Sequence, residues 1–196
     1  MTEAAVLPPQ DVTASLVRAL VLYSLAEFQS GHATTLRVTA EGHSFSVADN
    51  GRGHAIDRTV AGLPYLNFVY THLDYPFEQD RGAPLQLHAI GISLINVLCA
   101  ELDVTTHKRD ETLLMKFKRG RLCDYDVVNA KFRETGNGIS GHVNPQLQTS
   151  GVDTRLLREW LVELLTANPT LKLFFNGEEL HAPPRRDASP ISQAGA

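Results

Sequence analysis

The apolar positions of the chain first follow a helical pattern and then a strand pattern. A buried helix is predicted from about Asp11 to Ser30, because the middle of this segment is apolar on nearly every face and Gly31 follows it. The next apolar residues alternate with polar ones on either side of a turn at Glu41, which is typical of a β-hairpin. This hairpin is expected to end at Asp49.

Helical and strand patterns continue along the rest of the chain. Further helices are expected at residues 59–73, 91–101 and 153–168, and further strands at residues 102–107, 112–118, 122–128, 138–144 and 171–175. Pro64 lies inside the first of these helices, where it would stand near a helix start or at a kink. The order of elements predicts an α+β fold, a two-layer α/β sandwich with a mixed sheet and helices on one face.

The length and composition fit one globular domain with short flanking segments. The chain has 196 residues and a formal net charge of -4. We expect a flexible leader over residues 1–12, one folded domain over residues 13–181 and a disordered tail over residues 182–196. The negative charge argues against a protein whose main ligand is nucleic acid.

The cysteines and the apolar segments favour a cytoplasmic protein without a membrane or metal site. Cys99 and Cys123 show no metal-ligand spacing and are expected to be free thiols of a reducing compartment. The apolar stretch at residues 16–25 is about half the length that a membrane-spanning helix needs. A basic group within residues 108–121 could contact an acidic partner or DNA phosphate, but a solvated strand face explains it more simply.

Two sequence motifs carry the candidate chemistry. Residues 49–53, Asp-Asn-Gly-Arg-Gly, place an acid and two glycines at a strand end, where the backbone can approach a ligand closely. Alone, this pattern is also explained by a simple turn. Residues 87–98 run from a loop into a helix N-terminus, where free amides and the helix dipole suit phosphate. Together the two motifs are more specific than either is alone.

With these motifs the chain resembles the GHKL (Bergerat-fold) ATPase superfamily, and within it the ATP-binding domain of the gyrase B and topoisomerase IV B subunits. The resemblance covers about residues 16–180. It implies that Asp49 accepts a hydrogen bond from the adenine amino group and that Gly53, with Gly51, borders the base. Val47 would form an apolar wall of the same site.

The resemblance also assigns residues to the phosphate side and to the floor of the pocket. His88, Gly91 and Ser93 match the loop and helix that bind the phosphates in the family. Glu27 and Arg52 match a structural ion pair at the pocket floor. On the residues alone, a structural histidine between a loop and a helix explains His88 better than a ligand contact does.

The chain departs from the family at the positions that carry catalysis. Ala19 and Tyr23 stand where the family has a glutamate that activates water and an asparagine that binds Mg²⁺, and residues 18–26 contain no Asp, Glu, Asn or Gln. The glycines of the phosphate loop are replaced at residues 85–89, and Ile139 replaces an adenine-binding threonine. The resemblance therefore implies weak binding of ATP or ADP, a lost Mg²⁺ site and no efficient hydrolysis.

Other functions are compatible with the same residues. The fold could be a protein-interaction module that binds no nucleotide, with Tyr23 filling the volume of the lost metal site. A true ATPase would need a base from elsewhere, such as Glu78 or Asp80. The length matches the ATP-binding unit alone, without the transducer and DNA-gate regions of gyrase-type proteins, so we expect no direct DNA strand passage.

Overall fold

The computed structural model describes residues 11–72, 91–129 and 134–183, which form helices packed on one large sheet. The helices are α1 (Val12–Gln29), α2 (Tyr65–Thr71), α3 (Ile92–Leu98) and α4 (Thr154–Ala167). The strands are β1 (Thr35–Glu41), β2 (Ser44–Asp49), β3 (Thr59–Val60), β4 (Leu63–Pro64), β5 (Cys99–His107), β6 (Glu111–Lys118), β7 (Arg121–Asn129), β8 (Gly136–Val143), β9 (Lys172–Phe175) and β10 (Glu178–Leu180).

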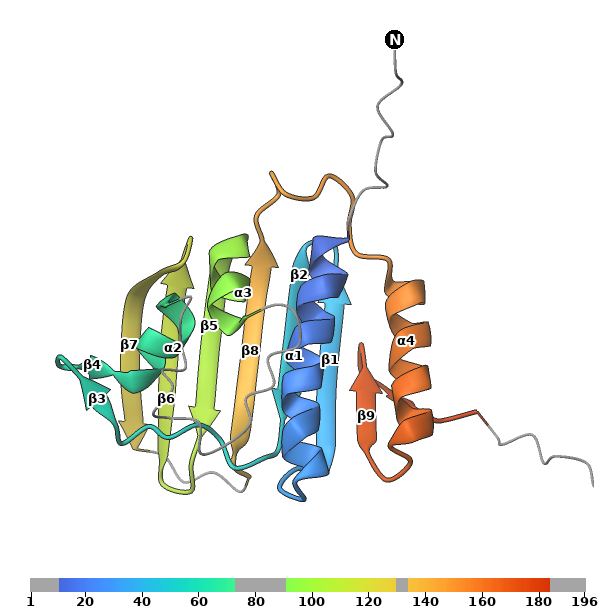
Figure 1. The fold of residues 1–196 in the computed structure, drawn as a ribbon, viewed down its shortest axis with the longest axis horizontal. Coiled ribbons are helices and arrows are strands. Elements are labelled where there is room, and N and C mark those ends of the chain that lie inside the picture. Colours follow the sequence, from blue (N-terminus) through green and yellow to red (C-terminus); the bar gives the residue numbers. More distant parts are fainter. Residues whose placement is uncertain (1–10, 73–90, 130–133, 184–196) are drawn as a thin grey trace, which may run out of the picture.

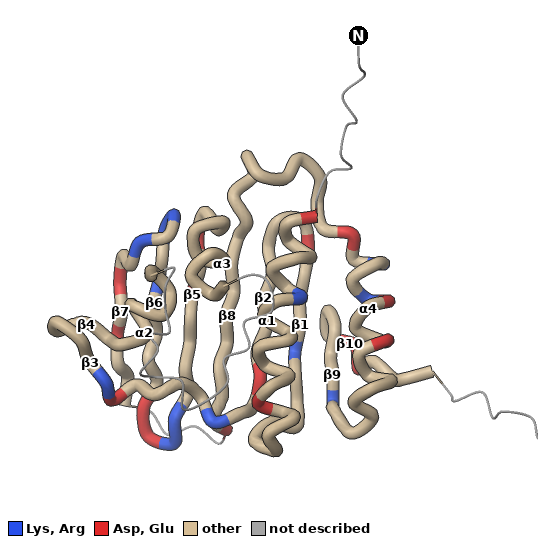
Figure 2. The backbone as a smooth tube through the Cα atoms, in the orientation of Figure 1, with Lys and Arg blue, Asp and Glu red and all other residues tan. Residues whose placement is uncertain are grey.

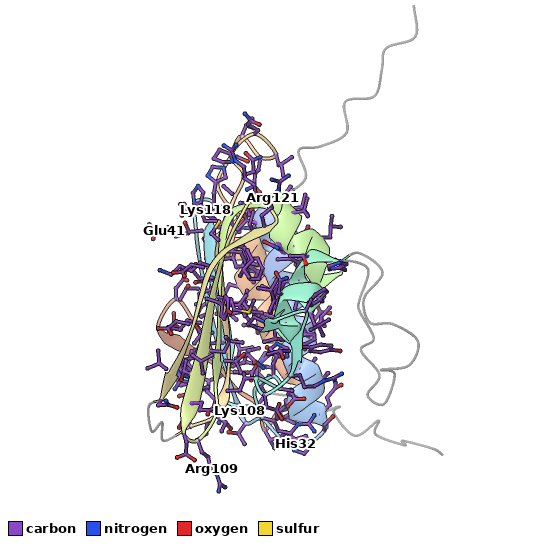
Figure 3. All side chains as sticks on the ribbon, turned by 90° about the vertical axis from the view of Figure 1, so that its left-hand side faces the viewer. His32, Glu41, Lys108, Arg109, Lys118 and Arg121 are labelled. Carbon is purple, nitrogen blue, oxygen red and sulfur yellow. The ribbon has the colours of Figure 1, made fainter. Side chains whose placement is uncertain are left out.

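The large sheet is mixed, and the helices cover one of its faces. Its eight strands follow the order β10-β9-β1-β2-β8-β5-β6-β7, and β3 pairs with β4 in a separate two-stranded ribbon. Within the large sheet β1 and β9 are parallel, and the other neighbouring strands are antiparallel. The ribbon views show the helices in front of the sheet (Figure 1) and to one side of it when it is turned edge-on (Figure 3). This arrangement confirms the predicted α+β class with a mixed sheet.

The first helix and hairpin form as their sequence pattern predicts. The Asp11 carboxylate accepts a hydrogen bond of 2.8 Å from the Ala14 amide, which satisfies one of the free amides at the start of α1. The alternating residues of the hairpin place Val38 opposite Val47, and both are buried. Asp49 therefore comes at the last position of β2, where the strand leaves the sheet.

The helix expected at residues 59–73 is wrong over its first part. Residues 59–64 form the β3–β4 ribbon, and only α2 is helical. Ala61 and Gly62 adopt positive φ angles of 50° and 80°, which make a tight turn. Pro64 has no amide hydrogen and stands before the first helical residue, so the helix begins after it.

The helix expected at residues 91–101 is also shorter than predicted. α3 ends at Leu98, and β5 begins at Cys99. Cys99 pairs with Val143 of β8, and the Leu98 carbonyl accepts a hydrogen bond of 3.0 Å from Asn144. Pairing with β8 thus takes over the backbone hydrogen bonds that a longer helix would have made.

Two expectations from the sequence concern the cysteines and the length of the apolar helices. Cys99 is buried, Cys123 is exposed, and both are free. Across residues 11–72, 91–129 and 134–183, the helices include none that is both long and apolar enough to cross a membrane.

Candidate functional site

The first feature of the candidate site is the Asp49 carboxylate at the end of β2. Ser24 of α1 donates a hydrogen bond of 2.9 Å to its Oδ2, and the Gly51 amide donates one of 2.9 Å to its Oδ1. The amide of Asn137, on β8, lies 3.4 Å from the same Oδ1. Burial raises the pKa of Asp49, and these hydrogen bonds oppose that rise. A helix, a loop and a strand thus fix the orientation of one carboxylate.

The two glycines of the 49–53 loop are required by the geometry around them. A Cβ at Gly51 would lie 2.9 Å from Oδ1 of Asp49 and 3.1 Å from Oε2 of Glu27. Gly53 has a positive φ of 69°, and a Cβ there would lie 2.8 Å from the carbonyl oxygen of His107. Only glycine fits these positions, which lets the loop pass closely between α1 and the β5–β6 turn.

The predicted pair of Glu27 and Arg52 connects the last turn of α1 to this loop. The guanidinium of Arg52 donates two hydrogen bonds, of 2.7 Å from Nη2 to Oε1 and 3.1 Å from Nε to Oε2. This contact is the main cause that lowers the pKa of Glu27. The Arg52 side chain is 58% exposed, so the pair contributes little stability but fixes the position of the loop.

Further side chains hold the same loop and were not assigned to it from the sequence. Lys108, in the turn between β5 and β6, donates from Nζ to the carbonyl oxygens of Arg52, at 2.8 Å, and Gly53, at 2.9 Å. Thr135 donates a hydrogen bond of 2.6 Å to the carbonyl oxygen of Gly51. Charged residues of both signs gather around the β5–β6 turn (Figure 2). The sequence pattern placed Lys108 only in an exposed basic group, because no local signal links it to a loop 55 positions earlier.

Asn137 connects the loop to the sheet. Its side-chain Oδ1 accepts hydrogen bonds of 3.0 Å from the His54 amide and 3.0 Å from the Thr106 hydroxyl. Because Asn137 is buried, its side chain satisfies the hydrogen-bonding requirement of both donors where water has little access. The start of β8 therefore supports the loop through backbone and side chain together.

Tyr23 contacts aromatic residues beside the Asp49 loop. Its hydroxyl lies 3.4 Å from Nδ1 of His54, and the His54 ring stands edge-on to Tyr70 at a centroid distance of 6.5 Å. Burial is the largest cause that raises the pKa of Tyr23, followed by the charges of Glu27 and Asp49. Burial also lowers the pKa of His54 to about 4. Near neutral pH this contact therefore joins an uncharged phenol to an uncharged imidazole.

The remaining predicted residues lie in the core or at the start of α3. Val47 is buried and pairs across strands with Ile139, which is also buried. Gly91 is the residue before α3, and Ser93 is buried in its first turn. In the described part of the chain, no hydrogen bond joins Gly91 or Ser93 to the loop of Asp49. His88, the replaced phosphate loop at residues 85–89, Glu78 and Asp80 lie outside the described residues.

The arrangement provides a hydrogen-bond acceptor with fixed geometry and few groups for catalysis. The Asp49 carboxylate can accept a hydrogen bond from an amino group. Glu27 is paired with Arg52, and Tyr23 is a half-buried phenol whose pKa is raised by desolvation. In the three described stretches no cluster of three His, Cys, Asp or Glu side chains could bind a metal ion.

The known proteins that the chain resembles include B subunits of DNA gyrase and of type 2 topoisomerase. No protein-family model matches the chain. It is 30% identical over 159 residues to the B subunit of DNA gyrase from Campylobacter jejuni, which is 78% of this chain and 20% of that protein. It is 30% identical over 166 residues to the same gyrase component of Streptococcus pyogenes serotype M3, covering 81% of this chain and 25% of the relative. The B subunit of the type 2 topoisomerase of Aquifex aeolicus is 26% identical over 160 residues, covering 79% of this chain and 20% of the relative. The chain thus spans a fifth to a quarter of the length of these relatives.

Proposed function

Because this chain is a relative of the B subunits of DNA gyrase and type 2 topoisomerase, as the sequence resemblance predicts, we propose that it binds an adenine nucleotide at the Asp49 loop, weakly and without efficient hydrolysis. The observation that carries this proposal is the fixed Asp49 carboxylate, with hydrogen bonds from Ser24, Gly51 and Asn137. A carboxylate with both oxygens oriented in this way can still accept a hydrogen bond from an exocyclic amine on a free lone pair.

The residues around Asp49 would bind the base and fix its orientation. Gly53 would border the base through its backbone, as the family resemblance implies, and Val47 would supply an apolar wall. The contacts of Arg52 and Lys108 keep the loop in place without touching the ligand. The proposed role of His88, Gly91 and Ser93 on the phosphate side rests on the family resemblance.

Hydrolysis is not supported by the residues of α1. Ala19 has no atom that could accept a proton from water. Tyr23 is a poor Mg²⁺ ligand, because this ion prefers carboxylate, carbonyl and water oxygens and desolvation keeps the phenol here uncharged. The residues present therefore do not fit the Mg²⁺ ion of the family, and the proposed function includes no step through it.

One observation favours a second candidate function, a protein-interaction module that binds no nucleotide. The His54 ring contacts the rings of both Tyr23 and Tyr70, and His54 follows directly after the 49–53 loop. If these rings occupy the space of the base, no nucleotide can enter. The fold would then serve only to present a surface to a protein partner.

Calorimetric titration of ATP and ADP, with Mg²⁺ and with EDTA, distinguishes these functions. We expect measurable binding that Mg²⁺ does not change, and phosphate release no faster than in buffer. Asp49→Asn should weaken binding about tenfold to a hundredfold, because it removes the charge from one hydrogen bond to the ligand. Asp103→Asn, which changes an exposed aspartate on β5, is the matched control and should bind as the native chain does.

Each outcome of this titration is decisive. Equal affinities of the native chain and Asp49→Asn would refute the adenine contact. Rapid phosphate release would refute the absence of hydrolysis. No binding at all, with a native melting temperature, would favour the interaction module.

A further inference from the structure

The strand β7 forms an open edge of the large sheet. Among the described strands it pairs only with β6, so the outer side of its backbone has no partner there. Along its nine residues, every residue except the half-buried Leu122 is exposed. Figure 3 looks onto this edge, with Arg121 labelled at one end of the strand. Open edges of this length are sites where another strand can pair.

Apolar side chains accumulate at this edge. Tyr125, Val127 and Val128 of β7 are 41%, 44% and 37% exposed. Val60 is 42% exposed and lies on the β3–β4 ribbon, which projects past this edge in Figure 1 and lies on the helix side of the sheet in Figure 3. Outside this edge, the described residues expose large apolar side chains on α3, on α4 and at Leu147. An apolar concentration on an unpaired strand indicates a contact surface.

The register with β6 decides on which face each β7 side chain lies. Arg121 and Asp124 pair with Lys118 and Lys116, which are exposed on the open face of the sheet. By the alternation of strand residues, Asp126 shares this open face.

The opposite face of β7 is apolar. Leu122 and Tyr125 pair with the buried residues Phe117 and Met115, so they lie on the face that the helices cover. Cys123 is left unpaired at a bulge, because the register shifts between Lys116 and Phe117.

We propose that β7 pairs antiparallel with β7 of a second copy of this chain, about a two-fold axis between Cys123 and Asp124. In this register Arg121 lies opposite Asp126 of the second copy, and Leu122 lies opposite Tyr125. The axis repeats each pair, so the interface has two ion pairs on the open face and two apolar pairs on the helix face. In a regular strand, Arg121 and Asp126 would lie on opposite faces, as would Leu122 and Tyr125. The bulge at Cys123 shifts the alternation by one residue, so the members of each pair lie on the same face.

The charges of β7 favour pairing with a second copy of β7 over pairing with a strand that carries charges of only one sign. The sequence from Arg121 to Asp126 is basic at one end and acidic at the other, so it complements itself when reversed. A register with its axis at Tyr125 would bring Asp124 opposite Asp126, and like charges opposite one another are destabilising. The charge pattern thus favours a second copy as the partner and disfavours the register centred on Tyr125.

Charge reversal in the full chain tests this interface by sedimentation velocity over a series of protein concentrations. The native chain should show a reversible equilibrium of monomer and dimer. Arg121→Glu and Asp126→Lys should each weaken dimerisation roughly tenfold or more, because each creates two repulsive pairs. The double variant should restore the native affinity. Lys172→Glu, an exposed charge on β9, is the control and should leave the equilibrium unchanged.

Cys123 provides an independent readout of the same axis. It is exposed, whereas Cys99 is buried, so a short bis-maleimide should link two Cys123 thiols across the axis. The linked dimer should disappear in Cys123→Ser and decline in Asp126→Lys. A native chain that stays monomeric, a dimer that neither charge reversal weakens, or a dimer that Cys123 fails to link would each overturn the proposal.

Discussion

His54 should make the stability of the fold depend on pH in a specific range. Its Nε2 atom is buried and has no hydrogen-bond partner in the described structure, and burial lowers its pKa from 6.5 to about 4. Between pH 6.5 and about pH 4, His54 therefore binds a proton in the unfolded chain but not in the folded chain. Protonation then favours the unfolded chain, so the free energy of unfolding decreases as the pH falls through this range. At about 1.4 kcal/mol per pKa unit, the full loss is about 3 kcal/mol.

Chemical denaturation at several pH values between about 4 and 7.5 measures this loss. The groups that influence His54 are Lys108, which opposes its protonation, Glu27, which favours it, and the hydroxyl of Tyr23. Because other groups also titrate, the informative quantity is the difference between the native chain and His54→Phe. This difference should change by about 3 kcal/mol across the range and stay constant above about pH 7. Equal pH dependence of the two proteins would refute the assignment of a neutral His54 with a buried Nε2 atom.

The stability of the loop that carries Asp49 should depend on Lys108 and Gly51. In urea titrations, Lys108→Met should lower the free energy of unfolding by about 1–2 kcal/mol, because two loop carbonyls lose a charged donor. The control Lys116→Met, on an exposed strand face, should change it by less than about 0.5 kcal/mol. Gly51→Ala should destabilise the fold by about 1–3 kcal/mol and remove nucleotide binding, because the added Cβ would press on Asp49. The control Gly138→Ala, whose Cβ would meet its nearest neighbours at 3.9 Å, should show the melting temperature of the native chain.

The parts of the fold that the sequence predicted well are those with strong local signals. The first and the last helix were predicted close to their observed bounds, and Asp11 and Asp153 cap α1 and α4 through hydrogen bonds between residues three positions apart. The β9–β10 hairpin follows from Asn176 and Gly177, whose positive φ angles of 48° and 86° suit a two-residue turn. The β3–β4 ribbon was missed because its strands are only two residues long and show no alternation.

The candidate site was predictable where a motif carried it and not elsewhere. The 49–53 motif located Asp49, and the family resemblance paired Glu27 with Arg52, as the structure shows. Ser24, Lys108 and Asn137 could not be assigned to the site in the same way. Each reaches the loop through tertiary packing, and a serine, a lysine or an asparagine at such positions has ordinary explanations on the surface or at a helix.

The convergence of distant segments on the Asp49 loop has a consequence for the order of folding. The contacts that shape the loop join residues 25, 55 and 88 positions apart, from α1, the β5–β6 turn and β8. Closing such long loops costs conformational entropy, which is offset only by the contacts of the completed sheet. The hairpin of β1 and β2 can therefore form early, whereas the candidate site at Asp49 is complete only once β8 has inserted between β2 and β5. A nascent chain that ends before β8 contains the whole 49–53 motif and still has no site.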